Sequence, residues 1–168
     1  YKAYQKQLDT ASAIWEQTGP QDYEYTYRHM CFCESSGINF LIRVKNGIII
    51  TVTNIENRQD APADDLPMYM TINDLFDTIQ TAINYKYDIL DLQFDPVYSY
   101  PTTINLDPIP LAIDDEVTYT AADLRPLRVT RITSQSGEDL LLDPFTILEA
   151  GITGDILSLA IQYSGGCN

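Results

Sequence analysis

A chain of 168 residues is long enough for one well-packed core, or for a domain of about 110 residues with a smaller unit attached. Acidic residues outnumber basic ones 24 to 10, and the net charge of −14 argues against binding to DNA, RNA or anionic membranes, because such binding depends on lysine and arginine. A hydrophobic content of 45% is typical of a folded protein, and no apolar run approaches the ~20 residues of a membrane span.

The first predicted element is an amphipathic helix over residues 2–17, in which Leu8 and Trp15 recur at helical spacing. Gly19–Pro20 ends it. Three strands are expected next, at residues 22–33, 38–44 and 48–54. Asn46–Gly47 joins the second strand to the third and is typical of a type I′ hairpin turn, because both positions tolerate a positive φ.

A polar loop is expected over residues 56–70, and a second helix follows it. Thr71 is the predicted N-cap, and Asp74 completes a pattern resembling a capping box. The helix is expected to run to about Tyr85. One apolar stripe should face the core, formed by Ile72, Leu75, Phe76, Ile79 and Ile83.

The second half of the chain is predicted to be β structure. Strands at 88–94 and 102–106 form a hairpin, and Asp114–Glu116 lies in an acidic loop after it. Short strands at 127–133 and 140–142 precede a last hairpin, made by residues 146–150 and 156–163. The predicted fold is α+β: two helices packed on a mostly antiparallel sheet within residues 1–118, with a small all-β C-terminal appendage over residues 119–168.

The densest group of reactive side chains lies on the first predicted strand. Alternation places six of them on one face: Tyr23, Tyr25, Tyr27, His29, Cys31 and Cys33. One imidazole and two thiolates are ligands for Zn or Cu. From His29 to Cys33 an extended strand spans ~14 Å, at ~3.4 Å per residue, so a metal site would need a bend. A redox-active pair is an alternative, but thioredoxin-like enzymes place their cysteines at a helix N-terminus rather than beside a strand.

A disulfide is the third use for these cysteines. In an ideal strand the Cα atoms of Cys31 and Cys33 lie ~7 Å apart, at the edge of what a disulfide spans. They can pair only if the chain bends at Phe32. A bridge from either residue to Cys167 is the alternative pairing. Three cysteines, two of them as Cys-x-Cys, fit an oxidising compartment or a metal site.

Calcium binding and hydrolysis are two further chemistries that the acidic residues and the histidine bring into question. Two loop clusters of carboxylates are candidate calcium ligands, namely Asp60, Asp64 and Asp65, and Asp114, Asp115 and Glu116. Neither matches the Asp-x-Asp-x-Asp-Gly calcium loop. A hydrolase has little to draw on, because the chain has one histidine and no Gly-x-Ser-x-Gly nucleophile motif.

Several motifs occur together in one order along the chain: Trp15, Tyr23-x-Tyr25, Cys31–Phe32–Cys33, Asn46–Gly47, the helix start Thr71–Phe76, and Tyr100–Pro101-x-x-Ile104-x-x-Asp107. This ordered set resembles a family of bacterial secreted proteins and lipoproteins known only as a domain of unknown function, over about residues 10–118. The resemblance implies a helix-plus-sheet domain outside the cytoplasm with no assigned activity. Because the resembling domain carries both cysteines without the tail, it favours the Cys31–Cys33 pairing. The chain departs from the pattern at Ser99, where the family usually has glycine.

The two ends of the chain lead to further expectations. The tail Gly165–Gly166–Cys167 is similar to a second bacterial module, in which a histidine-containing strand and another cysteine follow. The unit over residues 119–168 is therefore expected to be truncated. The chain opens on Tyr1 rather than methionine, which leaves open a signal peptide or a lipid anchor on the precursor.

The function predicted from these observations is a non-catalytic extracytoplasmic module of a bacterium, with a structural or protein-interaction role. Its partner is expected to be another envelope or extracellular protein, and nucleic acid is not expected to bind. No cofactor is predicted, with calcium as a secondary candidate. The alternative is a thiol-redox or metal-handling protein that uses His29, Cys31 and Cys33, and a hydrolase comes third.

Overall fold

The structure, a computed structural model, describes residues 1–33, 35–109, 115–127, 145–153 and 156–163. The chain divides into two units, Tyr1–Val129 and Thr130–Asn168. Within the described residues, no helix is long and apolar enough to cross a membrane.

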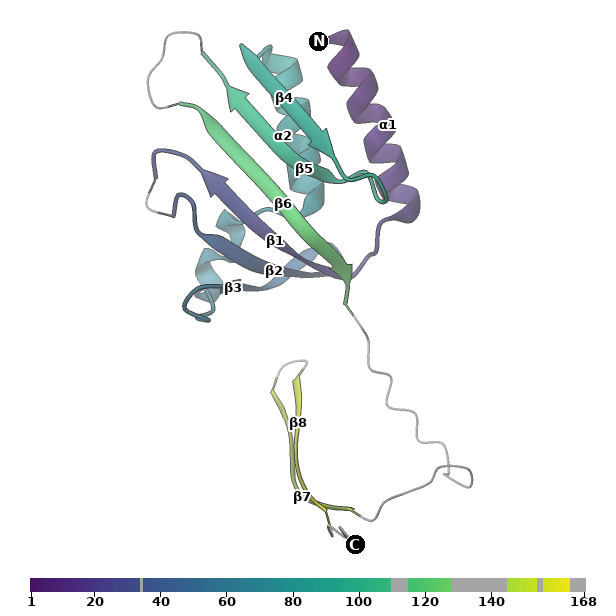
Figure 1. Cartoon of the computed structure of the whole chain (residues 1–168), viewed down its shortest axis with the longest axis vertical. Helices are drawn as coiled ribbons and strands as arrows, with labels where there is room; N and C mark the ends of the chain where they lie inside the picture. Colours follow the sequence, from purple (N-terminus) through teal and green to yellow (C-terminus); the bar gives the residue numbers. More distant parts are fainter. Residues whose placement is uncertain (34, 110–114, 128–144, 154–155, 164–168) are drawn as a thin grey trace, which may run out of the picture. The chain divides into compact units, whose positions relative to one another are not determined.

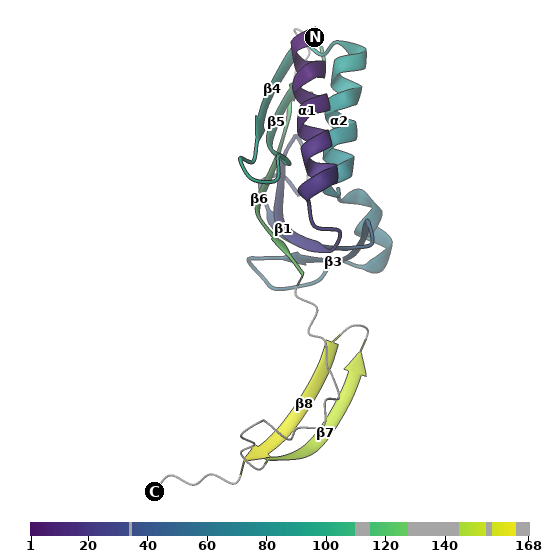
Figure 2. The same cartoon turned by 90° about the vertical axis from the view of Figure 1, so that its right-hand side faces the viewer.

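The described part of the first unit contains two long helices, one short 3₁₀ helix and six strands. In chain order these are α1 (Lys2–Thr18), β1 (Tyr23–Met30), β2 (Asn39–Lys45), β3 (Ile48–Asn54), η1 (Ala63–Met68), α2 (Ile72–Tyr85), β4 (Ile89–Phe94), β5 (Pro101–Asp107) and β6 (Val117–Pro126). The strands form one sheet in the order β3-β2-β1-β6-β5-β4, and every neighbouring pair is antiparallel (Figure 1). Helices α1 and α2 lie side by side over one face of this sheet (Figure 2). The predicted α+β class is confirmed.

The predicted local signals of α2 and of the β2–β3 turn are confirmed in detail. The Thr71 side chain accepts a hydrogen bond from the Asp74 backbone N–H at 3.1 Å, and Asp74 Oδ2 accepts one from the Thr71 N–H at 2.7 Å. All five residues of the apolar stripe are buried. Asn46 and Gly47 have φ values of 51° and 76°, as a type I′ turn requires.

Strand β6 was not predicted, and it is the strand that unites the sheet. It pairs with β1 on one side and β5 on the other, so it joins the β1–β2–β3 meander to the β4–β5 hairpin. It also crosses the boundary expected between residues 118 and 119. A signal was present, because Val117–Ala121 alternates apolar and threonine residues. The neighbouring acidic run led instead to the expectation of a loop there.

The core lies between the helices and the sheet. On β1 the rings of Tyr23, Tyr25 and Tyr27 share the helix-covered face, as predicted, and each is almost fully buried. Tyr23 Oη accepts a hydrogen bond from the first backbone N–H of α2, on Ile72, at 3.0 Å. The hydroxyl of Tyr25 donates to the backbone oxygen of Met70. Because these hydroxyls have partners, the row of tyrosines ties β1 to the start of α2 at little cost in desolvation.

A buried charge, Glu24, lies on the opposite face of the sheet. Glu24 is only 8% exposed and lies between Arg43 on β2 and Arg125 on β6. Arg43 Nε donates to Glu24 Oε2 at 2.8 Å, and Arg125 Nε donates to the other carboxylate oxygen. Burial by itself would raise the pKa of Glu24, but the two guanidinium groups outweigh it and hold the pKa below its ordinary value.

The second unit is described only as a hairpin of β7 (Phe145–Thr153) and β8 (Ile156–Tyr163), which pair antiparallel. The two strands lie where the last hairpin was predicted, and β7 extends three residues beyond the expected end at residue 150. The strand predicted at 140–142 lies outside the described residues, and so does the strand predicted at 127–133 apart from its first residue.

Candidate functional site

The candidate site is the turn that follows β1, which we call the cysteine loop (residues 31–33 and 35–37). The first predicted strand was expected to continue to residue 33, but β1 ends at Met30. The backbone turns there because the Gly37 N–H donates to the His29 carbonyl at 2.8 Å. Gly37 has a φ of 80°, which favours glycine at this position.

The serines of the loop support the same turn. The Cys31 N–H donates to Ser36 Oγ at 3.1 Å, and the Ser36 N–H donates to the Cys33 carbonyl at 3.2 Å. These bonds use backbone groups that a continuing strand would have paired with a neighbouring strand. The loop shape therefore rests on several hydrogen bonds in addition to any link between the cysteines.

Cys31 and Cys33 are joined by a disulfide, with their Cα atoms 5.3 Å apart. This separation is well inside the usual range for disulfides, whereas an extended strand would have placed them at its edge. The pairing is the one favoured by the family resemblance. The alternative partner, Cys167, lies outside the described residues.

The structure corrects the expected spread of His29, Cys31 and Cys33. A ring nitrogen of His29 and the two sulfur atoms all lie within 4.8 Å of one another, instead of along ~14 Å of extended chain. The bend after Met30 causes the difference, because it folds both cysteines back towards the histidine. Among the described residues, this is the one group of three or more His, Cys, Asp and Glu side chains within metal-binding reach of one another.

His29 is half-buried and held from two sides. Its Nε2 lies 3.0 Å from Ser35 Oγ, and its ring packs against Tyr27 with centroids 5.6 Å apart. Its Nδ1 is buried without a hydrogen-bond partner in the part of the chain that the structure describes. Burial lowers the pKa of His29, so the imidazole is largely neutral near pH 7.

Tyr27, against which the His29 ring packs, belongs to a cluster of aromatic side chains. Tyr27 contacts Tyr69 and Tyr119, with ring centroids 6.4 Å away in each case, and Phe40 packs on Tyr69 at 5.0 Å. Burial, and then the neighbouring Tyr119 and Tyr69, raise the pKa of Tyr27 well above its ordinary value, so its hydroxyl stays protonated. His29, which Ser35 of the loop contacts, therefore packs against a buried aromatic side chain.

Two exposed apolar side chains lie in or beside the cysteine loop. Phe32, between the two cysteines, is 84% exposed, and Met30 is 48% exposed. Of the described large hydrophobic side chains, Phe32 is the one with the highest exposure. Sequence reasoning considered Phe32 only as the place where the chain bends. Its exposure depends on the direction of the bend, which the strand pattern does not reveal.

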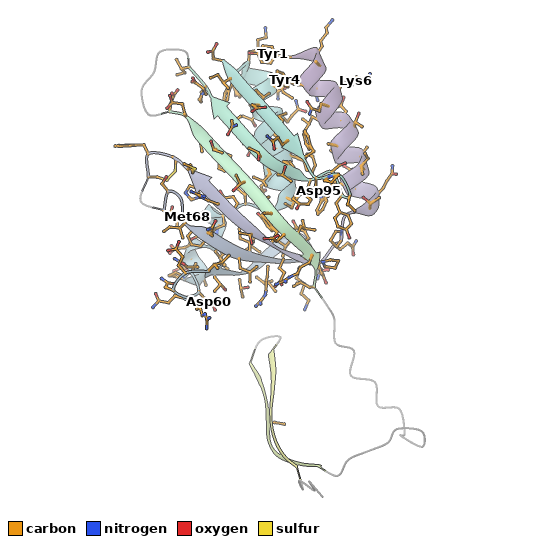
Figure 3. The ribbon with its side chains drawn as sticks, in the orientation of Figure 1. Tyr1, Tyr4, Lys6, Asp60, Met68 and Asp95 are labelled. Carbon is orange, nitrogen blue, oxygen red and sulfur yellow. A yellow bond between two sulfur atoms is a disulfide. The ribbon has the colours of Figure 1, made fainter. Side chains whose placement is uncertain are left out.

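The candidate calcium ligands are not assembled into a site of three or more residues among those described. Asp60 lies beside β3 and accepts a hydrogen bond from Thr53 Oγ1 (Figure 3). Asp64 and Asp65 occupy the first turn of η1. In the second cluster Asp114 lies outside the described residues, and Asp115 and Glu116 precede β6.

Two shallow hollows flank Trp15, and no sequence pattern predicted either of them. One, of about 370 Å³, lies between the end of α1, the β2–β3 turn and Thr71. The other, of about 410 Å³, lies between α1 and α2 and is bordered by Asp9 and Asp77. Their linings are mixed and acidic, and nothing in them gathers the groups that a catalytic centre needs.

The fold and the loop define an α+β domain with an antiparallel six-stranded sheet and a disulfide-closed turn at the end of β1. The chain belongs to a family of unknown function (DUF6174), whose model matches residues 7–126. The expected membership of a domain-of-unknown-function family is thus confirmed, over a range that includes all of β6. No curated protein and no solved structure matches the chain.

Proposed function

We propose that this chain is a non-catalytic module that acts outside the cytoplasm and binds another protein through the cysteine loop. The single observation that carries the proposal is the exposure of Phe32 on a loop closed by the Cys31–Cys33 disulfide. Aromatic residues supply much of the binding energy at protein interfaces, so an aromatic side chain exposed on a closed loop is suited to recognition.

The loop is preorganised for such contact. The disulfide and the hydrogen bonds of Ser36 and Gly37 fix the backbone on both sides of Phe32. A partner therefore does not need to order the loop, and less of the contact energy is spent on conformational entropy. The partner we propose is a protein with an apolar pocket for the Phe32 ring.

The disulfide also supports the proposed compartment. Disulfides form and persist in oxidising environments and are rare where glutathione and thioredoxin keep thiols reduced. The bacterial envelope or the surrounding medium is the location implied by the resemblance. Because the net charge of −14 would repel an acidic partner, we propose that the partner surface is not strongly acidic.

The alternative role in thiol redox or metal handling uses the same loop. The closeness of His29 to both sulfur atoms favours metal binding over redox catalysis. The cysteines follow a strand, and they lack the helix N-terminus that activates the thiol of thioredoxin-like enzymes. A hydrolase gains no support from any arrangement among the described residues.

Photo-crosslinking tests the interaction. A photoreactive phenylalanine analogue is placed at Phe32 and, as matched controls, at the exposed apolar residues Ile48 and Val97. In the organism that encodes the chain, we expect one reproducible protein adduct from position 32 and none of that mass from the controls. Opening the loop with Cys31→Ser and Cys33→Ser together should reduce the adduct by about tenfold, because the side chain is no longer preorganised.

Three outcomes would overturn this proposal. They are equal adducts from all three positions, no adduct from position 32, and an adduct that proves to be a second copy of this chain. A circular dichroism spectrum of the double serine variant that matches wild type ensures that any loss of adduct comes from the loop.

A further inference from the structure

The cysteine loop has the donor set of a soft-metal site once its two sulfurs are thiols. We propose that in the dithiol form the loop binds one Cu(I) ion through Cys31 Sγ, Cys33 Sγ and His29 Nδ1. This proposal does not depend on the Phe32 contact, since the two uses belong to different redox states of the same loop.

The geometry needs little change to hold an ion. With metal–sulfur bonds of about 2.3 Å and metal–nitrogen bonds of about 2.0 Å, the donor atoms around one ion lie ~3.5–4.5 Å apart. A ring nitrogen of His29 and the two sulfur atoms already lie within 4.8 Å of one another. Opening the disulfide lets the sulfur atoms separate, and Cys33 is exposed, so its side chain has room to rotate.

Without the disulfide the turn should keep its backbone hydrogen bonds, while the Phe32 segment between the two cysteines becomes more mobile. The Gly37–His29 and Ser36–Cys33 backbone hydrogen bonds do not involve the sulfur atoms, and neither does the bond from the Cys31 N–H to Ser36 Oγ. The backbone therefore presents both cysteines on the same side of the turn in either redox state. This preorganisation is what a metal site requires of its scaffold.

Ser35 orients the His29 ring, as hydrogen-bonding neighbours orient the histidines of metal sites. With the imidazole proton on Nε2, that nitrogen donates to Ser35 Oγ at 3.0 Å and the lone pair of Nδ1 remains free. Nδ1 is buried and has no hydrogen-bond partner among the described residues. An unsatisfied buried nitrogen is costly in a structural role, and a metal ion would satisfy it.

The number and type of donors select the metal. Thiolate sulfur prefers Cu(I) and zinc among common ions, and structural zinc is almost always bound by four protein ligands. The group here has three members, and the described residues add no fourth Cys, His, Asp or Glu to it. Cu(I) accepts such a low coordination number, so we assign it rather than zinc.

The chemistry balances in two steps. A dithiol reductant transfers two electrons and two protons to the Cys31–Cys33 disulfide, which breaks the S–S bond and leaves the reductant as its own disulfide. A newly made chain, still in the dithiol form, needs no reductant. Cu(I) then displaces the two thiol protons, which pass to solvent, and forms two copper–sulfur bonds.

A competition titration tests the site on the full chain. All proteins carry Cys167→Ser so that the third thiol takes no part, and they are reduced, freed of reductant and kept under anaerobic conditions. Cu(I) is supplied from a chromogenic chelator. We expect one Cu(I) per chain, an ultraviolet thiolate-to-copper absorption band, and protection of both loop cysteines from alkylation.

Variants distinguish the proposed ligands. Cys33→Ser should abolish binding at the same chelator concentration, and His29→Ala should weaken it by at least about tenfold. The oxidised parent should take no copper from the chelator. Tyr1→Phe, at an exposed position far along the chain from the loop, is the control and should bind like the parent.

The proposal is overturned if oxidised and reduced chains take up copper equally, or if Cys33→Ser binds like the parent. It is also overturned as a three-ligand site if His29→Ala leaves the affinity unchanged. Cys33 is exposed, so its replacement should leave folding intact, and circular dichroism of each variant checks this. None of these outcomes bears on the Phe32 crosslink.

Discussion

Replacing Trp15 by alanine is expected to lower the free energy of unfolding by about 3–5 kcal/mol, because a buried aromatic ring is lost and the cavity cannot fully collapse. Trp15 is 7% exposed and makes edge contacts with Tyr23 and Tyr100, at centroid distances of 5.5 and 6.3 Å. Its Nε1 donates to Asn73 Oδ1 at 2.9 Å. The side chain therefore connects α1 to β1, to α2 and to the residue before β5.

Two further variants separate the contributions of Trp15. Trp15→Phe keeps most of the apolar surface and loses the hydrogen bond to Asn73, so it should cost about 1–2 kcal/mol. Ile14→Ala, at the neighbouring and 37% exposed position, should cost less than about 1 kcal/mol. Urea unfolding followed by circular dichroism measures all three. Equal losses for Trp15→Ala and Ile14→Ala would show that α1 is not anchored through the tryptophan.

The second large effect is expected at Glu24. Glu24→Gln removes the charge that Arg43 and Arg125 share, and we expect it to cost about 1–2 kcal/mol at pH 7. The value is at the low end for a buried ion pair because both arginines are substantially exposed and screened by solvent.

The effect of Glu24 should also depend on pH. Its folded-state pKa lies below the ordinary value, so on acidification the unfolded chain takes up the proton first and protons favour unfolding. The contribution is thus complete above the ordinary pKa of about 4.3 and is lost as the pH falls through the lower folded pKa. Wild type and Glu24→Gln should converge in stability in acid, measured by urea unfolding at a series of pH values. Glu56→Gln, an exposed carboxylate, is the control, and a constant gap between wild type and Glu24→Gln at every pH would contradict the expectation.

Local patterns predicted the elements whose structure depends on local physics. The capping box of Thr71 and Asp74 and the stripe of α2 are decided within one helix, and Asn46–Gly47 within one turn. Strand β6 depends instead on pairing with β1, at least 87 residues away along the chain, and with β5, at least ten residues away. An acidic run beside β6 also obscured its alternation.

Sequence patterns identified residues of the candidate site but did not predict how these residues are arranged in space. Alternation placed His29, Cys31 and Cys33 on one strand face, which is right for His29 and wrong for the cysteines, because β1 ends at Met30. The turn depends on hydrogen bonds that link Ser36 and Gly37 to the backbone of residues 29–33. In a continuous strand those backbone groups would pair with a neighbouring strand instead. The exposure of Phe32 follows from that turn, so it could not be predicted without it.

We expect the native chain to carry a cysteine loop closed by a Cys31–Cys33 disulfide. Mass spectrometry tests it on protein purified without reductant, alkylated and digested with trypsin, because residues 29–43 and residues 132–168 fall in separate peptides. We predict that peptide 29–43 is unalkylated and two hydrogen atoms lighter than its dithiol form, and that it is not linked to peptide 132–168. A peptide 29–43 that carries two alkyl groups, or one that is bonded to the Cys167 peptide, would contradict the account.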